Sequence, residues 1–185
     1  MAFGSKKGRD EGAGGCGMAP YAETMARYNR WMNERLYEAC TQLTDDQRKR
    51  NVGAFFQSVH GTLNHILLAD RTWLARFAGE PVLYTSLNQE LYSDFSDLQR
   101  ERKQDDARIV AWAKTLTPDD LACPLRFTGI ASPESRTYPL GLVVTHFFNH
   151  QTHHRGQVTT LLSQHGIDPG VTDLLRLPGA WGAQA

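Results

Sequence analysis

The sequence predicts an all-α protein: a four-helix bundle with a possible small hairpin before the last long helix. Four long segments carry apolar residues at three- and four-residue spacing, which is the period of one helix face. Glycine and proline residues separate these segments, and little of the remaining chain resembles a strand. Helices with one apolar face bury it by packing against each other, which favours a bundle.

The first helix is expected over residues 21–43 and the second over residues 55–77, each with an apolar stripe. Phe55 opens the stripe of the second helix. Gly79 and Pro81 end it, because glycine accepts the left-handed conformation after a helix and proline cannot continue one.

The third helix is expected to begin after a cap at Ser93 or Asp94 and to run to about Leu116. Its charged middle, RERKQDDAR, is predicted to face solvent. The following Thr117-Pro118 sequence could start a short helical turn.

Residues 122–138 have no clear helical period, and CPLRFTG and SRTYPL are compatible with a small hairpin. The fourth helix is expected to start near Pro139, a residue suited to the first helical position, and to end at Gln164 or His165. Gly166 directly follows this helix, a position at which glycine is favoured because it accepts the left-handed conformation.

Composition limits the classes of function. The 185 residues include 20 basic and 20 acidic ones, and this neutral balance argues against nucleic-acid binding, which needs clustered positive charge. No apolar run is long enough to cross a membrane. The three cysteines are odd in number and far apart, which indicates a reducing, cytoplasmic location.

The N-terminal residues 1–17 are rich in glycine and charge and lack the apolar core of a secretory signal. We expect them to form a disordered extension of a single domain over residues 18–185. Met18 could be the true start, because the amphipathic pattern begins directly after it.

Four of the seven histidines lie in the stretch HFFNHQTHHRGQV, residues 146–158. His150 and His154 are four residues apart and therefore neighbours on one helix face, whereas His146 lies nearer the edge of that face and His153 points to the flank or to solvent. Each of the central pair could simply find a hydrogen-bond partner in the core. The H-x-x-x-H register favours a metal site instead, because it aims two nitrogens at one point.

A third ligand should come from another element, and the second helix offers His60 and His65. These residues lie on opposite borders of its apolar stripe, so the period separates them only weakly. The sequence contains no H-E-x-x-H motif of zincin proteases and no Glu-x-x-His pair of di-iron bundles.

The segments NHQTHHRGQV, TLNHILLADRTWL and YNRWMNERLYEAC resemble the DinB family of small metal-binding proteins, which is unrelated to the DNA polymerase of the same name. The resemblance implies a four-helix bundle with one divalent metal held by three histidines. On this sequence the ligand positions fall on His65, His150 and His154, and all three are histidine.

Three neutral imidazoles around a metal ion leave an open coordination position. Ligation by histidine alone suits zinc or nickel and is also compatible with iron or copper. The resemblance implies an enzyme, either a thiol S-transferase or isomerase that uses a low-molecular-weight thiol or a metal-dependent hydrolase. A non-enzymatic, stress-related binding or interaction protein with a structural metal is the alternative. The family's damage-inducible label suggests DNA binding, which the neutral charge opposes. A homodimer is expected because dimers are the commonest oligomers.

Three other polar residues lie close to these histidines in the sequence. Gln157 could lie behind the ligands or be a half-exposed polar residue, and the sequence does not separate these alternatives. Arg155 is expected to be a structural or interface charge. Asp70 is expected to project away from His65, which argues against a general base at that position.

Overall fold

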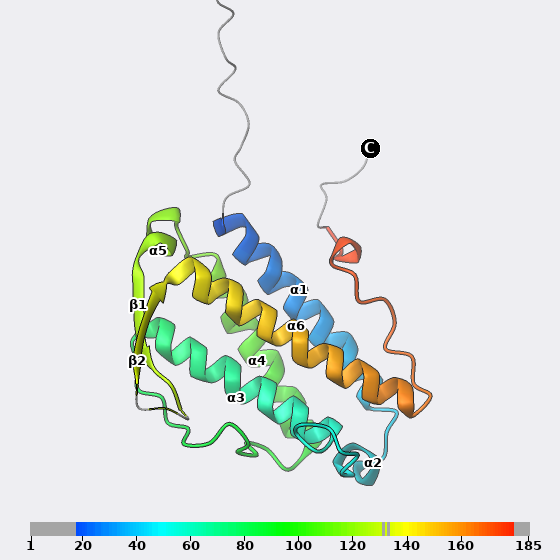
Figure 1. The fold of residues 1–185 in the computed structure, drawn as a ribbon. Coiled ribbons are helices and arrows are strands. Elements are labelled where there is room, and N and C mark those ends of the chain that lie inside the picture. Colours follow the sequence, from blue (N-terminus) through cyan, green and yellow to red (C-terminus); the bar gives the residue numbers. More distant parts are fainter. Residues whose placement is uncertain (1–17, 131, 133, 180–185) are drawn as a thin grey trace, which may run out of the picture.

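The computed structural model describes residues 18–130, 132 and 134–179, so the predicted extension over residues 1–17 lies outside the described part of the chain. The fold is mostly helical with one two-stranded sheet (Figure 1). Its long helices are α1 (Met18–Cys40), α3 (Val59–Ala78), α4 (Phe95–Ala113) and α6 (Leu140–Gln164). Its short elements are α2 (Asp45–Lys49), α5 (Pro118–Ala122), β1 (Pro124–Thr128), β2 (Ser135–Pro139) and a 3-10 helix at Leu174–Arg176.

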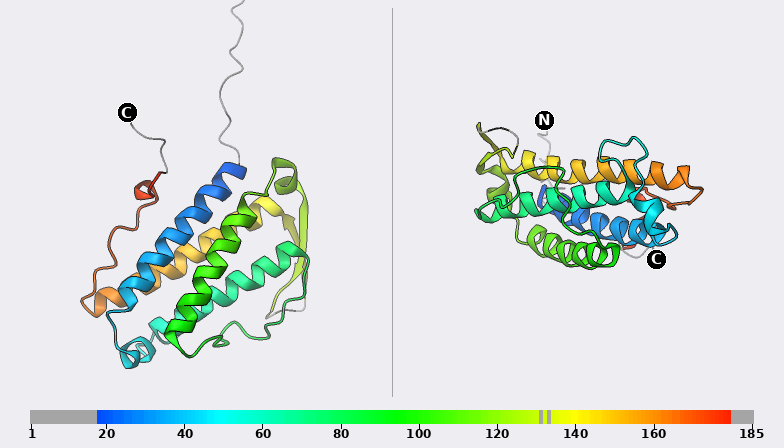
Figure 2. Two further views of the ribbon diagram at one scale, coloured as in Figure 1. Left: turned by 180° about the vertical axis from the view of Figure 1, so that it is seen from behind. Right: turned by 90° about the horizontal axis from the view of Figure 1, so that it is seen from below.

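The four long helices lie side by side, and α1 and α3 each pack against both α4 and α6. Figure 2 shows α6 and α4 on opposite sides of this group. The antiparallel hairpin β1–β2 lies beside the beginning of α6 and the end of α3 (Figure 1). None of the described helices is both long and apolar enough to cross a membrane.

Several of the predicted helix ends are confirmed, whereas both ends of α1 and the end of α4 lie three residues earlier than expected. Gly79 has a φ of 69° and caps α3 in the left-handed conformation, and the Asp94 side chain accepts a hydrogen bond from the Asp97 amide to cap α4. Thr117 caps the short helix α5, and Pro139 immediately precedes α6.

The predicted start of the second helix was wrong. Helix α3 begins at Val59 after a Ser58 cap, and Phe55 is 81% exposed instead of belonging to the apolar face. Gln57, just before the cap, has a φ of 67°, a backbone conformation that interrupts a helix. The predicted helix therefore began four residues too early, because Phe55 happened to fit the apolar period.

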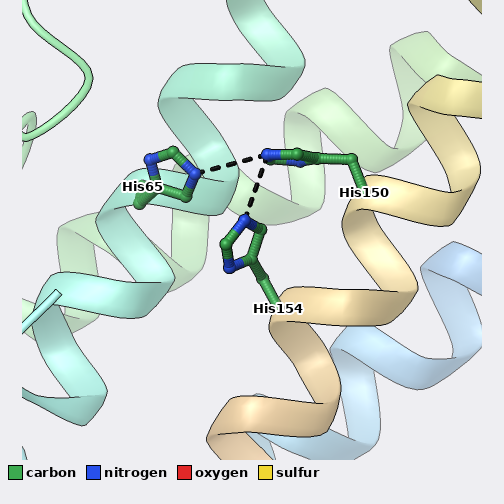
Figure 3. Close-up of side chains that lie close together, drawn as sticks. All are labelled: His65, His150 and His154. Carbon is green, nitrogen blue, oxygen red and sulfur yellow. Dashed lines mark hydrogen bonds between the residues drawn. The ribbon is translucent and has the colours of Figure 1, made fainter. Parts of the chain in front are cut away.

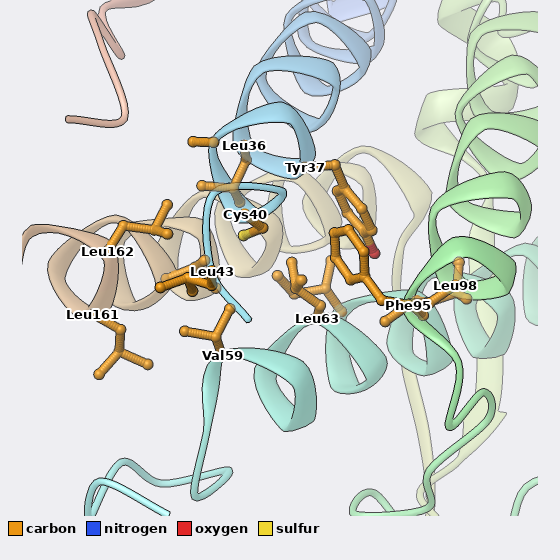
Figure 4. Packing of buried hydrophobic residues seen from close by; sticks show 14 residues of the cluster. Leu36, Tyr37, Cys40, Leu43, Val59, Leu63, Phe95, Leu98, Leu161 and Leu162 are labelled. Atoms are coloured by element: carbon orange, nitrogen blue, oxygen red, sulfur yellow. The ribbon is translucent and has the colours of Figure 1, made fainter. Parts of the chain in front are cut away.

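The apolar core forms two main clusters, one toward each end of the helices. The first surrounds Leu36, Leu63 and Leu162 and includes the stacked rings of Tyr37 and Phe95 (Figure 4). The second is built from aromatic and aliphatic side chains of five helices: Ala22, Ala26, Trp73, Ile109, Ala113, Leu121, Val143, Val144, Phe147 and Phe148.

The charged run of α4 was predicted to face solvent, and this prediction was wrong for three of its residues. Arg102, Asp105 and Asp106 are all buried. Arg102 donates from Nη1 to Asp70 Oδ2 at 2.5 Å, and its Nη2 lies 3.1 Å from Asp106 Oδ1. A buried charge is tolerated only when it is paired, and this arginine lies between two carboxylates.

Polar groups from the other long helices complete this network. Asn33 of α1 donates to Asp106 at 2.9 Å, and Gln151 of α6 donates to Asp70 at 2.8 Å. Arg155, also buried, donates to Asn29 of α1, so the expectation of a structural charge is confirmed. All four long helices thus meet in one buried polar network.

Candidate metal centre

His65 of α3 and His150 and His154 of α6 converge in the space between the two helices (Figure 3). The Nε2 atom of His150 lies 3.4 Å from Nε2 of His65 and 3.1 Å from Nε2 of His154. One ligand nitrogen from each residue lies within 4.8 Å of the others. The structure therefore brings together the three residues singled out from the sequence.

The opposite ring nitrogens of two of these histidines are fixed by oxygen atoms. His65 Nδ1 lies 2.9 Å from the carbonyl oxygen of Leu87, and His154 Nδ1 lies 2.8 Å from Oε1 of Gln157. Carbonyl and amide oxygens only accept hydrogen bonds, so each Nδ1 carries the proton. In the neutral ring, Nε2 of His65 and of His154 then carries a lone pair.

This arrangement leaves lone pairs facing one another. Nε2 of His150 can donate one proton at most, yet it faces the lone pairs of both His65 and His154. A cation at this point would satisfy all three nitrogens at once. A tetrahedral zinc ion with bonds of about 2.0–2.1 Å holds its ligand nitrogens about 3.3–3.4 Å apart, close to the spacing seen here. The residues therefore fit a metal ion.

Burial favours the neutral imidazoles that metal binding requires. It lowers the pKa of His65 to about 4 and that of His150 to about 3, and it also lowers the pKa of His154. The ring of Phe56 stacks on His65, with ring centres 3.7 Å apart, and so shields it from water. The three imidazoles are therefore unprotonated and ready for a cation at neutral pH.

The other histidines of the described chain do not join this group. His60, the second candidate in α3, is buried and places Nε2 2.9 Å from the carbonyl oxygen of Tyr92 and 3.3 Å from Glu90. His153 is exposed, as expected from the helix geometry, and lies 3.2 Å from the Gln157 amide nitrogen. Gln157 thus lies directly behind His154.

A cavity of about 310 Å³ reaches this histidine cluster. Its lining includes His65 and His150 of the cluster and also His146, Trp73 and Arg76. Small-molecule sites occupy clefts of about 300–1,000 Å³, so the cavity is large enough for a small ligand. Another cavity of about 280 Å³ also borders His65.

Several cavity residues were not assigned to the site from the sequence. The helix spacing placed His146 only at the edge of the histidine face, and in the structure its ring centre lies 6.0 Å from that of His150. Phe127 and Arg136 come from the hairpin, which reaches the cavity only through the tertiary fold. Asp70 faces Arg102 and Gln151 instead of the cavity, which agrees with its exclusion as a general base.

The fold and the cluster define a class of protein: a mainly helical chain with three buried or half-buried histidines that could hold a metal ion beside a cavity. The sequence model of the DinB family matches residues 18–182, and the chain belongs to this family. Protein DinB of Bacillus subtilis (strain 168) is 22% identical over 160 residues, which cover 84% of this chain and 92% of that protein.

Proposed function

We propose that His65, His150 and His154 hold one divalent metal ion and that the protein is a metal-dependent enzyme. Zinc and nickel are the preferred candidates for this ion. The observation that carries this proposal is the meeting of the three Nε2 atoms at the end of an accessible cavity. The reaction would be thiol transfer or isomerisation with a low-molecular-weight thiol, or hydrolysis. The four long helices would act as one bundle domain that supports this site.

An ion held by these three histidines would supply Lewis acidity, which would lower the pKa of a thiol or water bound to it. The chain supplies the remaining functions. His146 lines the cavity, and burial, with a smaller contribution from the charge of Arg76, lowers its pKa, so its neutral ring is suited to accept a proton from the substrate. Trp73 and Phe127 form apolar walls that limit water around the reacting group.

The alternative is a structural metal without catalysis. The three ligands come from two different helices, so an ion bound to them would link α3 to α6. If this were its only role, removing the metal would unfold the protein and no substrate would turn over. The cavity beside the ligands supports the enzyme over this alternative.

Elemental analysis of the purified protein tests the metal site. We expect about one equivalent of metal in the wild type and its loss from His65→Ala, His150→Ala and His154→Ala. His153→Ala is the matched control, because this exposed neighbour lies on the same helix and outside the cluster. A wild-type protein without metal, even after zinc or nickel is added, would refute the site.

Turnover is tested separately, by screening low-molecular-weight thiols with electrophiles, and hydrolysable esters, before and after chelation. Activity that disappears on chelation and returns with the metal would support the enzyme. A metal-loaded protein that turns over none of these while chelation unfolds it would favour the structural role.

A further inference from the structure

The cavity beside the histidines carries positive charge with little to neutralise it. Arg76 of α3 and Arg136 of β2 both line it, and among the described residues none of those lining it is acidic. The nearest carboxylate to Arg136 is that of the exposed Glu134, at 3.9 Å. Arg76 has no carboxylate within 4 Å in the described part of the chain. A ligand that enters this cavity therefore meets two guanidinium groups.

The Arg76 side chain is held in place at the cavity. Its Cζ lies 4.5 Å from the centre of the Trp73 ring and 4.8 Å from that of Phe127, so aromatic rings contact the guanidinium. Nη2 donates to the carbonyl oxygen of Thr128 at 2.9 Å, whereas the buried Nε has no partner among the described residues. A fixed guanidinium with spare donors is well suited to a carboxylate.

The surroundings of these arginines indicate the rest of the ligand. A second cavity of about 390 Å³ shares Trp73, Phe127, Arg136 and His146 with the first, so the two adjoin. Its remaining walls are apolar or aromatic: Tyr138, Leu142 and Val143. The combined space offers cationic groups near the histidines and an apolar chamber next to them.

We propose that this cavity binds a small organic acid, an aryl or alkyl carboxylate, with its carboxylate on Arg76 and Arg136 and its apolar body against Tyr138 and Leu142. The proposal rests on the proposed function in one respect: a substituent of the acid would reach the ion, because His65 and His150 border the same cavity. Binding of the acid itself requires the arginines and not the metal.

Calorimetric titration with benzoate tests this inference, with benzamide as the neutral analogue of the same shape. The variants are Arg76→Gln and the exposed-site Arg136→Gln, compared with Arg30→Gln, an exposed arginine of α1 outside the cavity. Each titration is run on the zinc-loaded and on the chelated protein, and circular dichroism confirms that every variant is folded.

We expect benzoate to bind the wild type and benzamide to bind much more weakly. Arg76→Gln should lower the affinity for benzoate about tenfold or more, which is the effect expected when a charge-assisted hydrogen bond is lost. Arg136→Gln should lower this affinity less, because the Arg136 side chain is more exposed. Arg30→Gln should bind as the wild type does. The difference between the wild type and Arg76→Gln should persist after chelation.

Three results would overturn the inference: benzoate affinity that is unchanged in both cavity variants, benzamide that binds as tightly as benzoate, or inorganic phosphate that binds more tightly than either. If benzoate binding is lost on chelation and is the same in the wild type and in Arg76→Gln, the acid binds the ion alone. Failure of the metal site is distinguishable, because a metal-free wild type would still bind benzoate through Arg76.

Discussion

Oε1 of Gln157 lies 2.8 Å from Nδ1 of His154, one turn further along the same helix. This contact fixes which nitrogen of His154 faces the other histidines. Substitution of the residue that orients a metal-binding histidine commonly lowers metal affinity about 10- to 100-fold. We expect Gln157→Leu to fall in this range in a competition with a chromophoric chelator, while the stoichiometry at saturation stays at one. Thr160→Ala, an exposed position of the same helix, is the control and should keep wild-type affinity.

Helix α3 makes a close approach to the preceding turn at Gly61. A Cβ at this position would overlap the carbonyl oxygen of Phe56, the residue whose ring stacks on His65. We therefore expect Gly61→Ala to lower the midpoint of thermal unfolding and to weaken metal binding, because Phe56 must move.

Gly156 of α6 provides the matched control, since it is also helical and has open space at its Cβ position. Gly156→Ala should raise stability by about 0.5–1 kcal/mol, the usual gain from replacing a helical glycine. Equal effects of the two substitutions in urea unfolding would show that the approach at Gly61 is not restrictive.

The buried Arg102 is the centre of the polar network, between Asp70 and Asp106. Arg102→Met should destabilise the protein by about 3–5 kcal/mol, because it leaves two buried carboxylates without their cation. Arg100→Gln removes an exposed arginine of the same helix and should cost less than about 1 kcal/mol. Chemical denaturation of both variants at neutral pH gives the comparison, and similar losses would contradict the central role of Arg102.

Stability of the metal-free protein should depend on pH through His65 and His150. Their folded pKa values, about 4 and about 3, lie below the value of about 6.5 expected in the unfolded chain. The unfolded state therefore binds more protons between these limits. The contribution of these histidines to the free energy of unfolding is complete above about pH 6.5 and decreases as the pH falls toward 4.

Urea unfolding of chelated protein at about pH 7 and about pH 5 measures this loss. A variant with both His65→Asn and His150→Asn should lose less stability over the same interval. An equal loss in the wild type and the double variant would assign the pH dependence to other groups.

The local parts of the site were predictable from the sequence, and the long-range parts were not. A helix places His150 and His154 together whatever surrounds it, so their spacing alone predicted their proximity. The choice between His60 and His65 depended on how α3 is rotated against α6, which the period does not determine. Family resemblance selected His65, and the structure places that residue in the cluster.

The buried charges of α4 show why the pattern of polar residues misled us. A charged residue normally indicates a solvent-facing position, and the run around Arg102 contains little else. Its partner Asp70 is 32 positions away in another helix, and no local sequence pattern predicts a pair over this separation. The hairpin, in contrast, was recognisable from its composition, although its contribution to the cavity was not.

The hairpin β1–β2 supplies Phe127, Arg136 and Tyr138 to the cavity walls but none of the three histidines. Part of the cavity wall therefore lies on a segment of the chain that contains none of the candidate metal ligands. If the proposed function holds, substitutions in the hairpin would alter this part of the cavity while the three histidines on α3 and α6 stay in place. Exchange of this one short segment would then reshape the cavity without touching the histidine cluster.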